Sequence, residues 1–389
     1  MKWLWLSGGI CRSHLLAALV SICLFLVCLA QESAAQDRGR ALGREMLRID
    51  AGGGAYDLAW SPDQKSLIGI VGRSLVAWNL SNGSVRWKLP FVRLLAGGGQ
   101  IAFLDGGARI IVHYTKAQVF DDKSNHAYAL SIVDAQSGRI IQDVPFDPPP
   151  QSGANRASSF AVSEDGRTIV VALGILGQVV IADTGRWQEI WRSPKREAVA
   201  SIALDQGRDR LILAGGSGGG RVQTWRLSSK SKISEFTTYK TGLSRMVFDR
   251  QTGAIFTGGD GKLQPVQPPI PGRPETFAGV EDDPETLVRA WDPATGALLR
   301  TYVGPGRNVS GLALSPNGKY LVAAKGRSIY PQKDAYVLAW ETASGRLVVA
   351  SSYGQGFLDA VAFSPNGERI AISSDAGIRI FQLTPALFP

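Results

Sequence analysis

The amino-acid sequence predicts an all-β repeat protein, and three observations support this fold class. The chain has 389 residues, which fits either several ordinary domains or one large repeat architecture. It contains 45 glycines and 20 prolines, which indicate frequent turns, and 44% apolar residues, which are enough for a substantial core. A short apolar phrase followed by a turn also returns along most of the chain. These features exclude a mainly disordered chain and argue against long helices.

The repeated phrase occurs seven times, in four clear copies and three weaker ones. The clear copies are LAWSPDQ from Leu58, FAVSEDG from Phe160, LALSPNG from Leu312 and VAFSPNG from Val361. The weaker copies begin at Ile101, Ile202 and Met246. One position of the phrase is small in every copy, as Ala59, Ala102, Ala161, Ala203, Val247, Ala313 and Ala362. A small side chain on one face of a short strand suits a place where neighbouring sheets converge.

A β-branched apolar run follows each phrase, and a second run then ends at a recurring position. That position is occupied by Trp78, Val133, Ala182, Trp225, Trp291, Trp340 and Phe381, at a mean spacing of about 50 residues. Tight turns such as SNG at 81–83, QSG at 136–138 and ATG at 294–296 come next. Each unit is therefore expected to contain three or four short strands joined by hairpins.

The turn phrase, the strand that ends in Trp, and Asp292 after Trp291 resemble WD40 repeats over residues 46–384. The resemblance implies a seven-bladed β-propeller, similar to divergent exported bacterial propellers. The Gly-His dipeptide of that family is absent, so its buried hydrogen-bond network with histidine is not expected. The last copy lacks a fourth strand. Met46–Asp50 is expected to supply it, because pairing the two chain ends removes open sheet edges.

The N-terminal residues have the layout of a secretory signal peptide. Lys2 and Arg12 precede an apolar run of 16 residues at 15–30, and small residues, Ser33 and Ala35, follow it. Cleavage is expected after Ala35, with a periplasmic or secreted product and no stable membrane insertion; an uncleaved N-terminal membrane anchor is the alternative. The expected layout is a signal peptide at 1–35, a linker at 36–45, the propeller at 46–384 and a C-terminal tail at 385–389.

Composition limits the chemistry of the processed chain. All three cysteines, Cys11, Cys23 and Cys28, lie in the signal segment, so disulfides and thiol catalysis are excluded after cleavage. Removing residues 1–35 leaves 40 basic and 32 acidic side chains, a net charge of +8. These charges are scattered, so a nucleic-acid partner is not expected.

Loop lengths distinguish the two faces of the predicted propeller. With strands lettered a to d from the hub outward, the a–b and c–d turns leave on one face, here the tight-turn face. The b–c and d–a connections leave on the other, here the insertion face. Insertions fall on the second face, at 114–128, 145–156, 215–220, 258–287 and 325–336. Long loops in compact domains are often functional, so this face is the expected binding surface, with neutral length variation as the alternative.

The candidate binding residues lie where strand a begins on the insertion face, beside the central channel. We select Tyr56, Asp57, Arg245 and Asp359, together with Tyr330, Lys333 and Asp334 from the sixth blade. A protein is the expected partner. Ordinary solvated rim residues are the alternative, because no convergent charge pattern selects one chemistry.

Catalytic motifs are weak. Zinc is not expected, because the processed chain has no cysteine and only His113 and His126. The string GGSGG at 215–219 fits G-x-S-x-G, but no helix follows it. The acidic residues Glu281, Asp282, Asp283 and Glu285 can be a Ca²⁺ loop or a solvated charge run. No metal or cofactor is expected.

Residues of the first unit have the spacing of a second motif. Ala77, Asn79, Asn82, Gly83 and Trp87 resemble the docking motif of quinoprotein propellers, some of which are enzymes using pyrroloquinoline quinone with Ca²⁺. Outer-strand packing of Trp87 is the alternative reading. The favoured interpretation is an exported non-catalytic scaffold that binds a protein or other ligand. The alternative is a lactonase-like or quinoprotein-like propeller enzyme with its site in the central channel mouth.

Overall fold

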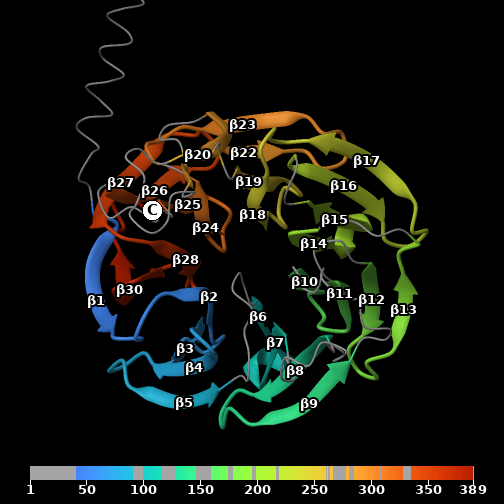
Figure 1. Ribbon diagram of the computed structural model, residues 1–389, viewed down its shortest axis with the longest axis horizontal. Coiled ribbons are helices and arrows are strands. Elements are labelled where there is room, and N and C mark those ends of the chain that lie inside the picture. The colour runs from blue at the N-terminus through green and yellow to red at the C-terminus, as the bar shows by residue number, and fades with distance from the viewer. Residues whose placement is uncertain are drawn as a thin grey trace, which may run out of the picture.

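The structure is a computed structural model of the chain. It describes residues 41–90, 100–115, 128–145, 159–173, 178–194, 199–215, 219–259, 261, 263–265, 277–279, 284–306, 308–326 and 334–388. These residues form seven four-stranded antiparallel sheets arranged in a ring (Figure 1). In each sheet the strand that follows a d–a connection, strand a, lies nearest the centre of the ring. The predicted seven-bladed β-propeller is therefore confirmed.

The blades follow one another along the chain. Blade 1 contains β2 (Ala55–Trp60), β3 (Ser66–Val71), β4 (Ser74–Asn79) and β5 (Val85–Pro90). Blade 2 contains β6 (Gln100–Leu104), β7 (Arg109–Thr115), β8 (Tyr128–Asp134) and β9 (Ile140–Pro145). Blade 3 contains β10 (Ser159–Val162), β11 (Thr168–Ala172), β12 (Val179–Asp183) and β13 (Glu189–Arg192). Blade 4 contains β14 (Ser201–Asp205), β15 (Arg210–Ala214), β16 (Arg221–Arg226) and β17 (Lys232–Thr237).

The remaining blades depart from this simple order in two places. Blade 5 contains β18 (Leu243–Phe248), β19 (Ile255–Gly259), β22 (Val288–Trp291) and β23 (Leu298–Tyr302). Between β19 and β22 a separate hairpin of β20 (Leu263–Pro265) and β21 (Phe277–Gly279) pairs only with itself. Blade 6 contains β24 (Val309–Leu314), β25 (Tyr320–Lys325), β26 (Asp334–Glu341) and β27 (Leu347–Gln355). Blade 7 contains β28 (Leu358–Phe363), β29 (Arg369–Ser374), β30 (Gly377–Leu383) and β1 (Gly43–Ile49).

The N-terminal strand closes the ring, as predicted. β1 pairs antiparallel with β30, with Gly43 opposite Leu383 and Ile49 opposite Ile378. The strand begins at Gly43, before the expected Met46, because pairing continues to the end of β30. The C-terminal residues also pack on the ring, since the Phe388 ring lies 4.9 Å from that of Tyr320. The packed unit therefore extends beyond residues 46–384 at both ends.

The hydrophobic core consists of seven clusters, each shared by two neighbouring blades of the described ring. The small-residue column contributes one side chain to each cluster. For example, Ala59 packs between blades 1 and 2, and Ala362 packs between blades 7 and 1. The column therefore does lie where neighbouring sheets converge. The second column lies on the third strand of each blade, where Trp78 and Trp340 are buried.

The serine of the repeated phrase closes the a–b hairpin. In blade 1 the Ser61 hydroxyl donates to Asp63 Oδ1 at 2.6 Å, and it accepts the Ser66 N–H at 2.9 Å. Ser163, Ser315 and Ser364 make the equivalent pair of bonds in the other clear copies. One buried hydroxyl thus satisfies both sides of the turn.

A buried hydrogen-bond network without histidine crosses blade 5. Trp291 Nε1 donates to Thr257 Oγ1 at 2.9 Å, and this oxygen lies 3.0 Å from the Tyr239 hydroxyl. The Tyr239 hydroxyl also lies 2.7 Å from the Thr257 carbonyl oxygen. Tyrosine from the d–a connection therefore links strands of this blade.

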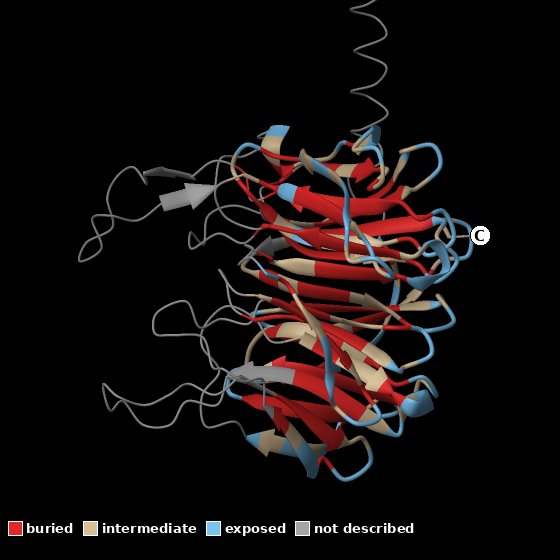
Figure 2. Ribbon diagram, turned by 90° about the vertical axis from the view of Figure 1, so that its right-hand side faces the viewer, coloured by how far each residue is buried: buried red, intermediate tan, exposed pale blue. Residues whose placement is uncertain are grey.

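The two faces of the disc differ as the sequence predicts. Antiparallel pairing places every b–c and d–a connection on the insertion face and every a–b and c–d turn on the tight-turn face. Figure 2 shows the disc edge-on, with buried strands inside and exposed turns along the tight-turn face. The β20–β21 hairpin belongs to the insertion face, and the sequence analysis expected only an insertion there.

Candidate binding site at the insertion-face mouth

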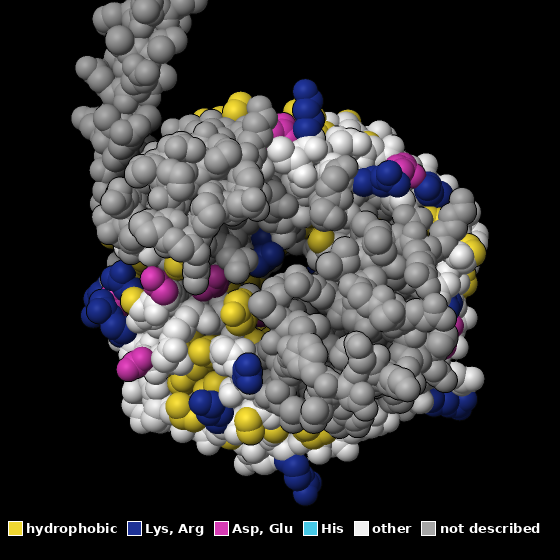
Figure 3. Space-filling view, viewed as in Figure 1, with side chains coloured by type: hydrophobic (Ala, Val, Ile, Leu, Met, Phe, Trp, Pro, Cys, Tyr) yellow, Lys and Arg dark blue, Asp and Glu magenta, His cyan; other side chains and the backbone are white. Residues whose placement is uncertain are grey.

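Four of the seven predicted site residues lie on inner strands at the insertion-face end of the channel. Tyr56 and Asp57 are on β2, Arg245 is on β18, and Asp359 is on β28. Figure 3 shows a narrow central opening with a basic side chain at its edge. The other three belong to the b–c connection of blade 6: Tyr330 and Lys333 lie outside the described residues, and only the backbone of Asp334 is described, as the first residue of β26.

The inner strands that hold these residues are bulged. Their pairing with the second strand shifts register between Ala55 and Leu58 in blade 1 and between Leu243 and Arg245 in blade 5. The same shift occurs in the intervening blades 6 and 7, whereas blades 2, 3 and 4 pair without a shift. Bulges redirect side chains and are frequent beside functional sites. The bulged half of the ring therefore carries all four candidate residues.

The Asp57 carboxylate links blade 1 to blade 2. Its Oδ2 accepts the Ile101 N–H at 2.8 Å, and its Oδ1 accepts the Leu58 N–H at 2.9 Å. Burial raises the pKa of Asp57 to about 6, although these two N–H groups and the positive charge of Arg245 act in the opposite direction. Asp57 is thus a structural link as well as a rim residue. Arg245 of blade 5 is thus close enough to influence the charge of Asp57 in blade 1.

Gln100 performs the same task one blade further on. Its Oε1 accepts the Phe160 N–H at 2.9 Å, so blade 2 is tied to blade 3. Gln100 occupies the position of the repeat that Asp57 holds in blade 1. The sequence analysis did not assign this position to interblade hydrogen bonding. A polar residue directly before a copy of the repeated phrase is the sequence feature that indicates this interblade hydrogen bond.

Asp359 lies against the start of the first blade. A Cβ atom on Gly54 would approach Asp359 Oδ2 to 2.1 Å, so only glycine leaves room for the carboxylate there. The adjacent Ala55 N–H donates to Ser373 Oγ at 2.5 Å. The carboxylate therefore sits at the junction of blades 7 and 1, where the ring closes.

Arg245 is exposed on the opposite side of the mouth. Its Nη1 donates to the Ser244 carbonyl oxygen at 2.9 Å, and the Ser244 hydroxyl donates to the Gly258 carbonyl oxygen at 2.9 Å. These bonds orient the bulged segment of β18. An exposed guanidinium and two half-buried carboxylates thus surround the opening, an arrangement suited to charged or polar groups of a partner.

Among the residues of the weak catalytic motifs, Trp87 and Glu285 are described, and both make contacts that stabilise the fold. Trp87 Nε1 donates to the Ala135 carbonyl oxygen at 3.0 Å, so this side chain docks on blade 2 as outer-strand packing. Glu285 accepts the Lys240 N–H and lies 3.8 Å from Arg289. Residues 281–283, 216–218 and His126 lie outside the described residues, as does the His113 side chain. Among described residues no group of three His, Cys, Asp or Glu side chains gathers around a metal-sized space.

The comparison with known families agrees with this architecture. The WD domain, G-beta repeat model matches residues 296–330, which include β23 and the first two strands of blade 6. The same strand pattern recurs in all seven blades of the described ring. The chain is a WD40-like seven-bladed β-propeller.

The WD40-like propeller is also similar to a plant protein. WD repeat-containing protein VIP3 from Arabidopsis thaliana is 29% identical over 128 residues, which are 29% of this chain and 38% of that protein. The match thus spans well under half of the relative. Within its described portion the propeller contains no helix of sufficient length and apolarity to cross a bilayer.

Proposed function

We propose that the WD40-like propeller is an exported, non-catalytic scaffold that binds a protein partner at the insertion-face mouth. WD40 propellers generally mediate protein interactions. The observation that carries the choice of face is the bulged arc of blades 5, 6, 7 and 1. It holds Asp57, Arg245 and Asp359 at fixed positions on paired strands. Sites on rigid strands present charges with little entropic cost on binding.

Export is supported by the N-terminal pattern and by cysteine placement. The 16-residue apolar run with small residues before position 36 fits a cleaved signal peptide, and every cysteine precedes that position. Mass spectrometry of the native protein tests this part of the proposal. A mature N-terminus at Gln36 is expected, whereas Met1 in a membrane fraction would establish an anchor.

The choice of face is tested by alanine substitutions on the insertion face and on the tight-turn face. After affinity capture and mass spectrometry identify a protein partner, Tyr56→Ala, Arg245→Ala and Asp359→Ala are compared by binding titration. Truncating an interface anchor typically costs more than about 1 kcal/mol, which is roughly a fivefold loss of affinity. At least one of these variants is expected to show such a loss.

Controls on the tight-turn face require care. Asn317 and Asn366 are unsuitable, because each accepts a serine hydroxyl and a backbone N–H inside a turn. Lys65→Ala and Lys319→Ala are better, since both side chains are exposed on a–b turns and match Arg245 in charge. Loss of binding in these controls, with normal binding in the rim variants, would assign the interface to the other face.

A further inference from the structure

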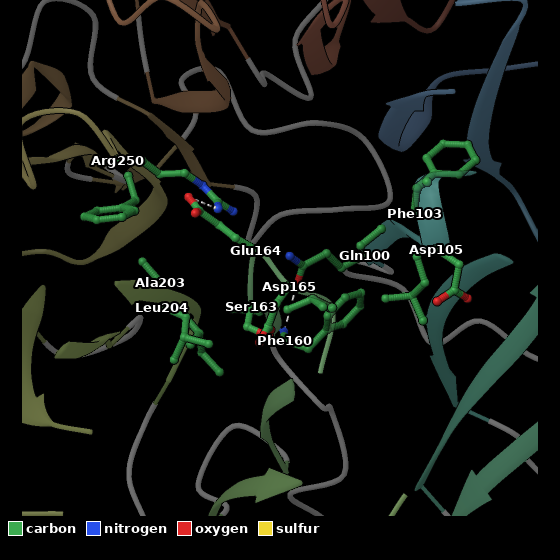
Figure 4. A pocket seen from close by; sticks show the side chains of 18 residues that line it. Gln100, Phe103, Asp105, Phe160, Ser163, Glu164, Asp165, Ala203, Leu204 and Arg250 are labelled. Atoms are coloured by element: carbon green, nitrogen blue, oxygen red, sulfur yellow. Dashed lines mark hydrogen bonds and ion pairs between the residues drawn. The ribbon is translucent and has the colours of Figure 1, made fainter. Parts of the chain in front are cut away.

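A cavity lies in the central channel and extends from Gln100, at the start of β6, to the tight-turn face. Its volume is about 590 Å³, and the inner strands of blades 2, 3 and 4 line it together with Phe248 and Arg250 of blade 5. It reaches the tight-turn face, because Asp105 and Glu164 of the a–b turns also line it (Figure 4). Cavities of about 300–1,000 Å³ commonly hold small ligands.

The repeat itself contributes to the wall of this space. Three consecutive members of the small-residue column, Ala102, Ala161 and Ala203, line the cavity. Each of the three also packs against an interblade cluster, so it lies where the neighbouring blade meets the channel. Half-buried Phe103 and Phe248 add aromatic surface from blades 2 and 5. The wall of the cavity therefore offers an aromatic contact surface among polar groups such as Gln100 and Ser163.

The mouth of the cavity is charged, and its charges are unequal. Arg250 Nη1 lies 2.5 Å from Glu164 Oε1, so an ion pair joins blade 5 to blade 3 across blade 4. Both side chains are more than half exposed, at 53% and 68%, so the pair is weakly held. Asp105 and Asp165 also line the cavity, which gives three carboxylates against one guanidinium.

The two aspartates remain charged in the folded protein. Asp105 pairs with Arg109, and Asp165 accepts the Ser163 hydroxyl at 2.6 Å and the Arg167 N–H at 3.0 Å. These interactions hold the pKa of both carboxyls below their usual range. Arg109 offsets the charge of Asp105, and Arg250 offsets that of Glu164, so Asp165 carries the excess negative charge that favours a cation over an anion.

We propose that this cavity binds a cationic amphiphile, that is, an ammonium or guanidinium group carried on an apolar stem. The stem lies against Phe103, Phe248 and the alanine wall, and the cation takes the place of Arg250 beside Glu164. The ligand is either a free amine or the side chain of a basic residue in a peptide. The cavity lining contains none of the rim residues Tyr56, Asp57, Arg245 and Asp359.

The test uses three probes of similar size that differ in charge. Ligand-observed NMR titration of the purified chain is carried out with phenethylammonium, 2-phenylethanol and 3-phenylpropionate. The proposal requires the ammonium probe to bind most tightly and to weaken as ionic strength rises. An acetylated tetrapeptide containing Lys and Phe is titrated in parallel, and the tighter of the two cationic probes identifies the source. The proposal would be overturned if 3-phenylpropionate bound more tightly than phenethylammonium, or if none of the probes bound.

Two substitutions of the ion pair give opposite expectations. Glu164→Gln removes a carboxylate and is expected to weaken phenethylammonium binding about fivefold. Arg250→Gln removes the competing cation and is expected to tighten it. Glu189→Gln is the matched control, because Glu189 forms an ion pair with Arg192 at 2.6 Å on the outer strand of blade 3. Equal affinities for all four proteins would place phenethylammonium outside the cavity and contradict the proposal.

Discussion

At the residue scale, Tyr239 shows how this propeller replaces a histidine network. Its ring is 1% exposed, and burial raises the pKa of the phenol well above its usual value, so the hydroxyl stays neutral and can both donate and accept. The hydroxyl lies within 3.0 Å of oxygens of Thr257 and within 2.9 Å of the Leu287 carbonyl oxygen. It therefore connects the d–a connection that follows blade 4 with β19 and with the residue that precedes β22 in blade 5.

Removing this hydroxyl is expected to destabilise the ring. Tyr239→Phe leaves buried acceptors of Thr257 and Leu287 with fewer partners, which typically costs about 1–3 kcal/mol. The melting temperature measured by calorimetry is expected to fall by several degrees. The control is Tyr353→Phe, since Tyr353 shows ring contacts but no hydroxyl hydrogen bond in the described part of the chain. Equal melting temperatures for the two variants would show that the network adds no stability.

Asp57 gives a second residue-scale prediction, which concerns pH. Its pKa is about 6 in the folded protein and 3.8 in the reference state, so the folded protein binds this proton more tightly. The contribution of Asp57 to stability is therefore largest below pH 4 and is lost as pH rises through 6, by about 3 kcal/mol. The unfolding free energy of wild type, measured relative to that of Asp57→Asn, is therefore expected to fall by about 3 kcal/mol from pH 4 to pH 7.

A neighbouring carboxylate provides a control of opposite sign. The Ser61 hydroxyl and the Lys65 N–H lower the pKa of Asp63, so its contribution is present at neutral pH and is lost on acidification. Denaturant titrations measure the unfolding free energy of each variant relative to wild type. As pH rises, this relative stability is expected to increase for Asp57→Asn and to decrease for Asp63→Asn. A parallel pH dependence for both variants would contradict the buried character of Asp57.

At the scale of elements, the c–d turns connect neighbouring blades. The glycine of each described turn of the SNG, QSG, ATG and ASG type has a positive φ and packs beneath the outer strand of the preceding blade. Gly138, with φ of 72°, lies under Trp87, and Gly296, with φ of 76°, lies under Phe236. Gly83 and Gly345 make the equivalent contacts with Leu47 and Arg300. The turn residue thus serves both backbone geometry and interblade packing.

This double role predicts an unequal cost for two glycine substitutions. A Cβ on Gly138 would lie 2.5 Å from the Trp87 ring, whereas a Cβ on Gly72, which has φ of 56°, meets nothing within 4 Å. Gly72→Ala is expected to cost about 1 kcal/mol for its left-handed backbone alone. Gly138→Ala adds displacement of Trp87, so its cost measured by denaturant unfolding is expected to be clearly larger. Equal costs would mean that Trp87 moves freely away from blade 2.

The outcome of sequence-based prediction follows from which features repeat. The alanine and tryptophan columns and the SPDG-like turns recur in fixed register, so blade number, strand order and the role of Trp87 in packing were predictable. The β20–β21 hairpin was not, because it occurs once and its strands contain three residues each. Among rim residues, the position of Asp57 was predictable, but its bond to Ile101 depends on how adjacent blades converge.

The cavity that reaches the tight-turn face illustrates the same limit. Its lining residues belong to blades 2 to 5, and each of these blades contributes a separate segment of the chain. The sequence analysis placed the expected binding surface on the other face, because the turns of this one are short. The cavity, however, depends on how the inner strands and a–b turns of blades 2 to 5 converge, which no single segment of the sequence predicts.

At the scale of the whole molecule, closure by β1 makes the ring cooperative. The strand pairs with β30 along its length, and buried Leu42 and Ile49 contribute to two different interblade clusters. Glu45 adds an ion pair to Arg379 on β30. Without β1, the edge of β30 is unpaired, and two clusters lose apolar contacts at once.

A chain that begins at residue 52 is therefore expected to melt at a much lower temperature than one that begins at residue 41, and to aggregate through the β30 edge. A synthetic peptide of residues 41–51, added in excess, is expected to restore much of the difference, because it supplies the missing strand in trans. The same peptide with Ile49→Asp is the control, since it places a charge in a buried position that is 2% exposed. If the two chains melt alike, the seventh blade is stable with three strands and the closure does not hold the ring together.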